Sequence, residues 1–432
     1  MASSLSAATV PKRKPRPFLI TGATVIDGTG APPMEDVSLL VRDGRFAEIG
    51  PSRAPAPRGV RVVDAAGKWI IPGLVDAHVH VESAADARAM IRWGVTSARL
   101  MAESVESSQA AAARSRARRR TPEFFPAAPI FTAPGGWWSS EPPDPKIDRF
   151  PPSAAAARAA VLKARGLGSA EIKIMNDDMG WCRDPLPRLP KIGADVRAAL
   201  IRSARENGLR VAVHAPDLAD ARDAVADGAT VLAHGIVDAP VPAELAARMR
   251  SEGVFYVPTL DIFDFLADPR AFMRRALSDV RIRESLPVRT LARYRSDAYF
   301  DTYRDRYPNA AWVSRQLPVL YGNVKALAAA GVDVALGTDM WAFPGAGAHL
   351  ELEDLVAAGM TPLQALRAAT LVSARSIGAG ADRGTIETGK RADFIVLEND
   401  PARDIRNTRS IERVFKGGRV AWSRYRSEKT DD

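Results

Sequence analysis

Cysteine and long apolar runs are nearly absent from this 432-residue sequence. The single cysteine, Cys182, excludes an internal disulfide and any zinc cluster built from cysteines. It lies in a segment rich in Trp and Pro with no base beside it, so we interpret it as a bystander rather than a nucleophile. No apolar run reaches the roughly 18 residues of a membrane span, and residues 1–17 lack the apolar stretch of a secretory signal. We therefore predict a disordered tail over residues 1–17 and a cytoplasmic protein.

Charge of one sign is not concentrated either. The 60 Lys and Arg stand against 51 Asp and Glu, and both signs are spread along the chain. The one dense basic run, residues 114–120, follows an Ala-rich stretch. We interpret it as a solvated helix face with a C-terminal end that favours cations. We expect a small-molecule substrate, no nucleic-acid or membrane partner, and a homo-oligomeric assembly.

Strand patterns occupy both ends of the chain, and an alternating pattern occupies the middle. The predicted terminal strands are residues 18–25, 37–41, 46–49, 392–397, 411–416 and 419–422. The predicted central strands are 74–80, 96–100, 130–132, 171–175, 210–214, 230–234, 254–257 and 332–337, between helices such as 154–165, 194–206, 218–227 and 243–253. Eight strands that alternate with helices are typical of a parallel (β/α)8 barrel. The predicted fold class is α/β: a TIM-like (β/α)8 barrel over residues 74–385, with a small β-sandwich domain formed by residues 18–73 and 386–425.

Three long segments follow strand candidates and have little regular pattern. They are residues 135–152, 176–193 and 260–318, and the last is expected to be partly helical. Segments in these places would lie at the C-terminal face of a barrel, where barrel active sites are built.

The sequence has only five histidines, so their positions are informative. His78 and His80 are two residues apart at the end of the first central strand, and such residues face the same way. Two imidazoles directed at one point form a metal-ligand geometry. His214 and His234 end two later strands with the same inward parity.

Two more residues have inward parity. Asp339 follows the alternating apolar residues after Val332. Lys173 lies between Ile172 and Ile174, and a charged residue buried there must be paired or chemically changed. Each residue alone has an ordinary structural explanation, but six ligand-type side chains at successive strand ends are hard to explain by packing. We interpret the set as a metal site.

Several motifs carry a resemblance to a known family. They are residues 71–80 (IPGLVDAHVH), 94–97, 172–175, 213–215, 233–235, 257–260, 337–339 and 384–394 (GTIETGKRADF). In this order they resemble the amidohydrolase superfamily, specifically its imidazolonepropionase/prolidase-like branch, over nearly the whole chain. The motifs are specific for the superfamily and not for a substrate.

The resemblance implies two divalent metal ions, usually Zn²⁺. His78, His80 and Asp339 would hold the first metal, and His214 and His234 the second. Lys173 would bridge the two metals as a carbamate formed with carbon dioxide, and burial favours the neutral amine that this reaction needs. A metal also lowers the pKa of bound water, and Asp339 would take that water's proton and deliver it to the leaving group.

The remaining histidine, His349, follows the eighth strand. It resembles a loop histidine that family members use near substrate, which would make it catalytic or substrate-binding. Equally, it could be a residue at the start of a helix.

The chain departs from the family pattern after the second and third strands. It reads ARLMAE at residues 98–103 where relatives often carry Arg-Asp, and PGGWW at 134–138 where they often have Gly-Gly-His. Five aromatic residues fall in loops after strands: Trp137, Trp138, Trp181, Trp341 and Phe343. We predict that they line a mouth for an apolar or aromatic substrate, and that the enzyme hydrolyses an amide, carbamate, urea or related bond.

Two other functions remain open. A mononuclear deaminase of the same superfamily uses an acidic residue three after a strand-5 histidine, and Asp217 follows His214 by three. A non-catalytic binding protein that keeps the fold is the second. Two metals per chain, with activity lost in Lys173→Ala, would favour the binuclear hydrolase.

Overall fold

The computed structural model of the protein describes residues 16–52, 56–102, 104–339 and 341–425. Most of the tail predicted over residues 1–17 therefore lies outside the described residues. None of the helices in the described part of the chain has the length and hydropathy of a membrane-spanning segment.

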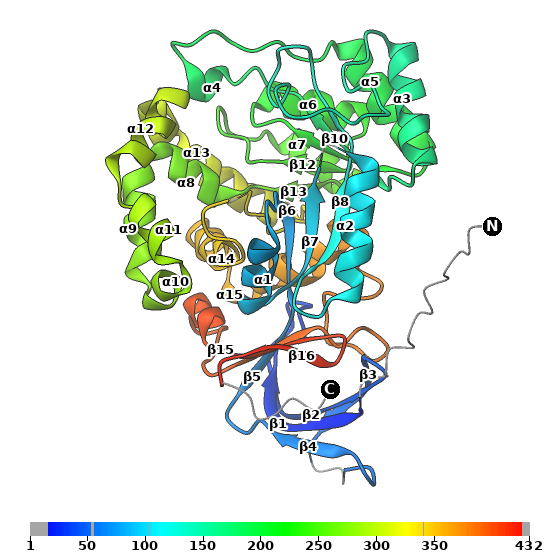
Figure 1. Ribbon diagram of the computed structural model, residues 1–432, viewed down its shortest axis with the longest axis vertical. Coiled ribbons are helices and arrows are strands. Elements are labelled where there is room, and N and C mark those ends of the chain that lie inside the picture. The colour runs from blue at the N-terminus through cyan, green and yellow to red at the C-terminus, as the bar shows by residue number, and fades with distance from the viewer. Residues whose placement is uncertain (1–15, 53–55, 103, 340, 426–432) are drawn as a thin grey trace, which may run out of the picture.

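Strands from both ends of the chain form one sheet of eight strands, which we call the terminal sheet (Figure 1). They are β1 (Phe18–Val25), β2 (Met34–Arg42), β3 (Arg45–Pro51), β4 (Arg61–Asp64), β5 (Trp69–Pro72), β14 (Phe394–Leu397), β15 (Ile411–Lys416) and β16 (Arg419–Ser423). Their order is β16-β15-β14-β5-β1-β2-β3, with β4 paired to β1. The pairing is continuous, so the two separate sheets expected of a sandwich are not found among the described strands.

The terminal sheet curls around its own apolar core. Phe18 of β1 stacks on Phe415 of β15 with ring centroids 5.5 Å apart, although two strands lie between them in the sheet order. Phe394 stacks on the same ring at 4.3 Å. This contact between distant strands encloses a core that is separate from the core of the central region.

The central strands are parallel and fall into two sheets. The first holds β6 (Leu74–Val79), β7 (Val95–Met101) and β8 (Glu123–Ala127), and the second holds β9 (Ile130–Phe131), β10 (Glu171–Met175), β11 (Arg210–His214), β12 (Val231–Ala233) and β13 (Phe255–Val257). The third predicted strand is thus in two pieces: β8 pairs with β7, and β9 pairs with β10. Strand β8 was not expected from the sequence.

The eighth predicted strand, residues 332–337, is only an isolated bridge. Val334 pairs with Tyr256 of β13, and the backbone N–H of Ala77 in β6 donates to the carbonyl of Leu336 at 2.9 Å. This segment therefore joins the two parallel sheets without forming a ladder on either side. The order of the strands is that of a barrel, although no continuous ladder of strands closes it among the described residues.

Helices follow most of the central strands (Figure 1). They are α1 (Ala84–Arg92), α2 (Val105–Ala117), α3 (Ala154–Gly166), α4 (Gly180–Arg183), α5 (Ala194–Glu206), α6 (Leu218–Asp227), α7 (Ala243–Glu252), α14 (Gly347–Ala357), α15 (Pro362–Arg367), the π-helical turn η1 (Ala368–Val372) and α16 (Ser373–Ser376). A short 3-10 helix, η2 (Ile405–Arg409), precedes β15. Helix α15 begins with a capping box in which Thr361 and Gln364 satisfy each other's backbone N–H groups, as its sequence signature suggests.

The long segment after β13 is largely helical, in agreement with the sequence. It contains α8 (Leu260–Ala267), α9 (Pro269–Ser278), α10 (Val280–Ser285), α11 (Val288–Arg293), α12 (Asp297–Arg306) and α13 (Ala310–Ala329). We call α8–α13 the helical insertion. It lies along one side of the molecule, away from α3 and α5 (Figure 1).

Candidate active site

Three ligand-type side chains meet where β6 ends. The ligand atoms of His78, His80 and Asp339 all lie within 4.8 Å of one another. Asp339 Oδ1 is 3.5 Å from Nε2 of His78 and 3.3 Å from Nε2 of His80. These residues come from the end of β6 and from the segment that bridges the two parallel sheets, so the bridge brings them together.

Two more histidines extend this group. His234 Nδ1 is 4.0 Å from Asp339 Oδ2, and the His234 ring centroid lies 4.7 Å from that of His78. The His214 ring is 4.4 Å from that of His234. Burial lowers the pKa of both His78 and His234 well below the ordinary value, so both rings are neutral, the form that binds metals.

Lys173 lies in β10 with its side chain buried, at 2% exposure. Its Nζ has no hydrogen-bond partner among the described residues. Burial lowers the pKa of Lys173 to about 7, although the nearby Asp339 carboxylate acts to raise it. The amine of Lys173 is buried near Asp339 and has no hydrogen-bond acceptor among the described residues. A lysine in such an environment is a candidate for chemical modification.

Buried nitrogen atoms without hydrogen-bond partners also make the site suitable for metal ions. His214 Nδ1 is buried and has no partner among the described residues, like Lys173 Nζ. His234 Nδ1 contacts the hydroxyl of Thr259 at 2.9 Å, which leaves Nε2 for a ligand. A group with neutral imidazoles, a carboxylate and unpartnered buried nitrogens matches the donor set that divalent metals such as Zn²⁺ prefer.

Backbone strain gathers around these residues. Of the seven described non-glycine residues with positive φ, five lie in segments that follow central strands: Trp138 (70°), Met179 (58°), His234 (73°), Thr259 (49°) and Asp339 (51°). Side chains adopt this region rarely, at a cost of about 1–3 kcal/mol each. Strain of this kind at the ends of several strands is typical of a functional site.

The residues of the chain from 69 to 421 match the model of the amidohydrolase family. The chain belongs to the amidohydrolase family. Among curated relatives, ochratoxinase from Aspergillus niger is 28% identical over 270 residues, which cover 61% of this chain and 48% of that protein. The chain thus spans about half the length of this relative. Imidazolonepropionase from Deinococcus deserti is 26% identical over 413 residues, which cover 91% of this chain and 92% of that protein.

A solved structure supports the same fold. The crystal structure of a Xaa-Pro dipeptidase with bound methionine matches with a TM-score of 0.74 at 21% identity, over 94% of this chain and all of that one. Together with the family, this likeness implies a TIM-like barrel for the central region.

Three of the aromatic residues predicted for the mouth of this amidohydrolase remain partly exposed. The Trp138 ring lies 4.9 Å from that of His80 and 6.2 Å from that of Trp137. Trp341 stacks on Tyr303 of α12 at 5.4 Å with an interplanar angle of 15°. Trp137 packs at 6.2 Å against Tyr307 of the helical insertion. Burial raises the pKa of the Tyr307 hydroxyl, and the Asp339 carboxylate also acts to raise it.

Two other predicted substrate residues are placed elsewhere. Phe343 is 1% exposed and packs against Phe272 and Tyr294 in the core. Trp181 is 8% exposed, and its indole N–H donates to a buried carboxylate rather than facing a mouth. The expectation that these rings contact substrate is therefore corrected: burial among helical-insertion residues occupies them.

His349 does not join the cluster. It lies in α14 at 1% exposure, with Nδ1 2.8 Å from the hydroxyl of Thr408 and Nε2 2.9 Å from the carbonyl of Trp93. Burial lowers its pKa to about 3. Both ring nitrogens are engaged by neutral groups, so the catalytic and substrate-binding roles predicted for His349 are wrong and the helix interpretation holds.

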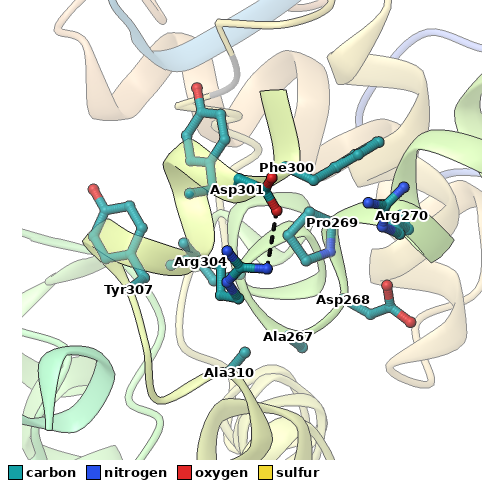
Figure 2. A pocket seen from close by; sticks show the side chains of 11 residues that line it. Ala267, Asp268, Pro269, Arg270, Phe300, Asp301, Arg304, Tyr307 and Ala310 are labelled. Atoms are coloured by element: carbon teal, nitrogen blue, oxygen red, sulfur yellow. Dashed lines mark ion pairs between the residues drawn. The ribbon is translucent and has the colours of Figure 1, made fainter. Parts of the chain in front are cut away.

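A pocket of about 210 Å³ lies in the helical insertion, and Figure 2 shows it closely. All its lining residues come from residues 266–310, and an ion pair joins Arg304 to Asp301 at 2.9 Å inside it. Tyr303 and Tyr307 line this pocket and also contact Trp341 and Trp137. Tyr303 and Tyr307 therefore connect the lining of this pocket to Trp341 and Trp137.

A buried carboxylate that was not predicted from the sequence holds the backbone around the proposed metal ligands. Asp76 is buried, and its carboxylate accepts from the backbone N–H groups of His78 (3.1 Å) and Thr338 (3.0 Å) and from the Thr338 hydroxyl (2.8 Å). Burial raises the pKa of Asp76 to about 7. Inward parity was visible for Asp76, but its partner Thr338 lies 262 residues away.

Cys182 is buried, and burial raises the pKa of its thiol, which agrees with its interpretation as a bystander.

Proposed function

We propose that this amidohydrolase uses divalent metal ions to hydrolyse a carbon–nitrogen or related carbon–oxygen bond of a small, apolar or aromatic molecule. The observation that carries the proposal is the meeting of His78, His80, His234 and Asp339 beside the unpartnered Lys173. These side chains come from distant parts of the sequence and are largely buried, which packing alone does not explain.

Each side chain has a proposed place. His78, His80 and Asp339 would hold one ion, His214 and His234 would hold another, and Lys173, as a carbamate, would help to hold both. Two bound cations, Zn²⁺ in our proposal, supply Lewis-acid activation of water and of the substrate carbonyl.

The protein's own residues move the proton. The water oxygen bonds to the carbonyl carbon, and Asp339 Oδ2 accepts a proton from that water. Asp339 then returns the proton to the leaving nitrogen as the carbon–nitrogen bond breaks. The products are an acid and an amine, so atoms and charge balance without a further reactant.

Substrate choice rests on the partly exposed Trp137, Trp138 and Trp341. Trp138 lies against His80, so a group bound at the metal site would touch its ring. A flat apolar surface this close to the site favours an aromatic or aliphatic substituent over a charged one.

A hydrolysis screen of the metal-loaded protein tests the proposal. Aryl amides, carbamates and ureas are expected to be cleaved, while aryl phosphoesters and lactones serve as other electrophiles. Cleavage restricted to charged dipeptides would contradict the apolar substrate class, and the absence of cleavage across all classes would contradict the activity.

A Trp137→Ala variant tests the aromatic mouth. An aromatic contact contributes about 0.5–1.5 kcal/mol, so KM for an apolar substrate should rise by about 2- to 10-fold with little change in kcat. The control is Trp422→Ala in β16, a partly buried tryptophan of the terminal sheet. Unchanged affinity in Trp137→Ala would remove this ring from the substrate site.

A further inference from the structure

Asp177 lies in the loop after β10 and is not one of the predicted metal ligands. It is buried, at 1% exposure. Its Oδ2 lies 2.9 Å from Nε2 of His214 and accepts the indole N–H of Trp181, also at 2.9 Å. Its Oδ1 accepts the backbone N–H of Met179 at 2.7 Å. Three contacts from three directions therefore fix this carboxylate.

The contact with Asp177 decides which atom of His214 is available. A carboxylate against Nε2 holds the proton on that nitrogen and leaves the lone pair on Nδ1. His214 Nδ1 is buried and has no partner among the described residues. The ring of His214 lies 4.4 Å from that of His234, so Nδ1 belongs to the same group of unsatisfied atoms as the proposed second metal site.

Trp181 connects Asp177 to the helical insertion. The carbonyl of Trp181 accepts from Asn309 Nδ2 at 3.0 Å, and the carbonyl of Cys182 accepts from the Asn309 backbone N–H at 3.1 Å. Asn309 directly precedes α13. A continuous set of hydrogen bonds thus runs from the start of α13 through Trp181 and Asp177 to His214.

We propose that Asp177 is a positioning residue that holds His214 with Nδ1 directed at the second metal, and that Trp181 holds Asp177 in place. This inference rests on the proposed metal site. We therefore expect the indole N–H of Trp181 to affect metal binding through the Asp177 carboxylate, without contact between Trp181 and the metal or substrate.

Three variants test the proposal. Asp177→Asn keeps the volume of the side chain and removes its charge. Trp181→Phe removes the indole N–H but keeps a ring to pack on Phe263, 5.4 Å away. The matched control is Asp178→Asn, because the neighbouring carboxylate pairs with Arg188 at 3.0 Å instead of with a histidine.

The measurements are metal content per chain after dialysis against graded chelator, and the visible spectrum of the Co²⁺-loaded protein. Asp177→Asn should weaken the second metal by about 10- to 100-fold, and Trp181→Phe should weaken it less and in the same direction. Both should perturb one of two Co²⁺ environments. Thermal unfolding of the metal-free proteins should stay near that of the wild type.

The outcomes separate the inference from the proposed function. A wild type that binds no metal contradicts the proposed function itself. A wild type with two metals and an Asp177→Asn variant of equal affinity overturns the role of Asp177. Equal weakening in Asp178→Asn also overturns it, because the effect would then not depend on the contact between Asp177 and His214. If Asp177→Asn does not fold, Trp181→Phe decides: wild-type affinity and Co²⁺ spectrum in that variant overturn the inference.

Discussion

At the residue scale, the ligand-type side chains were predictable because strand parity limits their directions. His78 and His80 share a face, and the same parity predicted that Lys173 faces inward, where its side chain is buried. His349 was not predictable, because the sequence does not distinguish a loop at the barrel mouth from the buried start of α14. Its partners Trp93 and Thr408 are 256 and 59 residues away.

A His349→Ala variant tests the structural role of this histidine. It leaves the Trp93 carbonyl and the Thr408 hydroxyl with one partner fewer in a buried place, so the free energy of unfolding should fall by about 1–3 kcal/mol. Chemical denaturation measures this loss. KM and kcat of the folded variant should match the wild type, and a large fall in kcat without loss of stability would restore the catalytic interpretation.

At the element scale, helix α8 begins without a cap from its own sequence. The Thr259 hydroxyl is directed to His234 instead, and Thr259 makes no capping hydrogen bond to its own helix. Glu351 of α14 accepts from the N–H groups of Leu260 (3.0 Å) and Asp261 (2.9 Å). Because Glu351 caps α8, the Thr259 hydroxyl is available to contact His234. Local sequence signals could not predict this, because Glu351 lies in another helix.

The same arrangement places two buried carboxyl groups together. Burial raises the pKa of Asp261 well above its ordinary value of 3.8, and the neighbouring Glu351 raises it further. Burial raises the pKa of Glu351 to about 8. The folded protein therefore keeps a proton that the unfolded chain releases near pH 4, so this pair loses stability as the pH rises from about 4 toward 8.

An Asp261→Asn variant should weaken this dependence, because it removes one of the two raised carboxyl groups. The amide keeps the shape of the side chain and does not titrate in this range. The stability of the variant relative to the wild type should therefore increase with pH, by up to about 1.4 kcal/mol per pH unit. Denaturant unfolding of both proteins from about pH 5 to about pH 8 measures the difference. Parallel curves would contradict the shared proton, and the exposed Asp305→Asn serves as the control that should run parallel.

At the scale of the whole molecule, α/β class and the order of elements followed from periodicity, because strands and helices alternate with clear apolar patterns. The split of the third strand and the single bridge at Val334 did not, because they depend on pairing between distant segments. The curl of the terminal sheet likewise depends on contacts such as Phe18 with Phe415. The homo-oligomeric assembly stays a prediction.

Lys416 of β15 attaches the terminal sheet to the central region. Its Nζ donates to the carbonyls of Ser115 (3.2 Å), Arg118 (3.2 Å) and Thr121 (2.7 Å) around the C-terminal end of α2. Lys416→Met removes all three hydrogen bonds at a buried place, so the free energy of unfolding should fall by about 1–3 kcal/mol. Arg424→Met, which removes an exposed pair with Glu398, should change it by less than about 0.5 kcal/mol. Equal losses in the two variants would contradict this attachment.

The proposed two-metal site with Lys173 between the metals is the central claim, and metal content measured together with activity tests it most directly. We expect two divalent metals per chain in the wild type, and loss of one metal and of activity in Lys173→Ala. One metal per chain, with activity that survives Lys173→Ala, would contradict the account and favour a mononuclear deaminase.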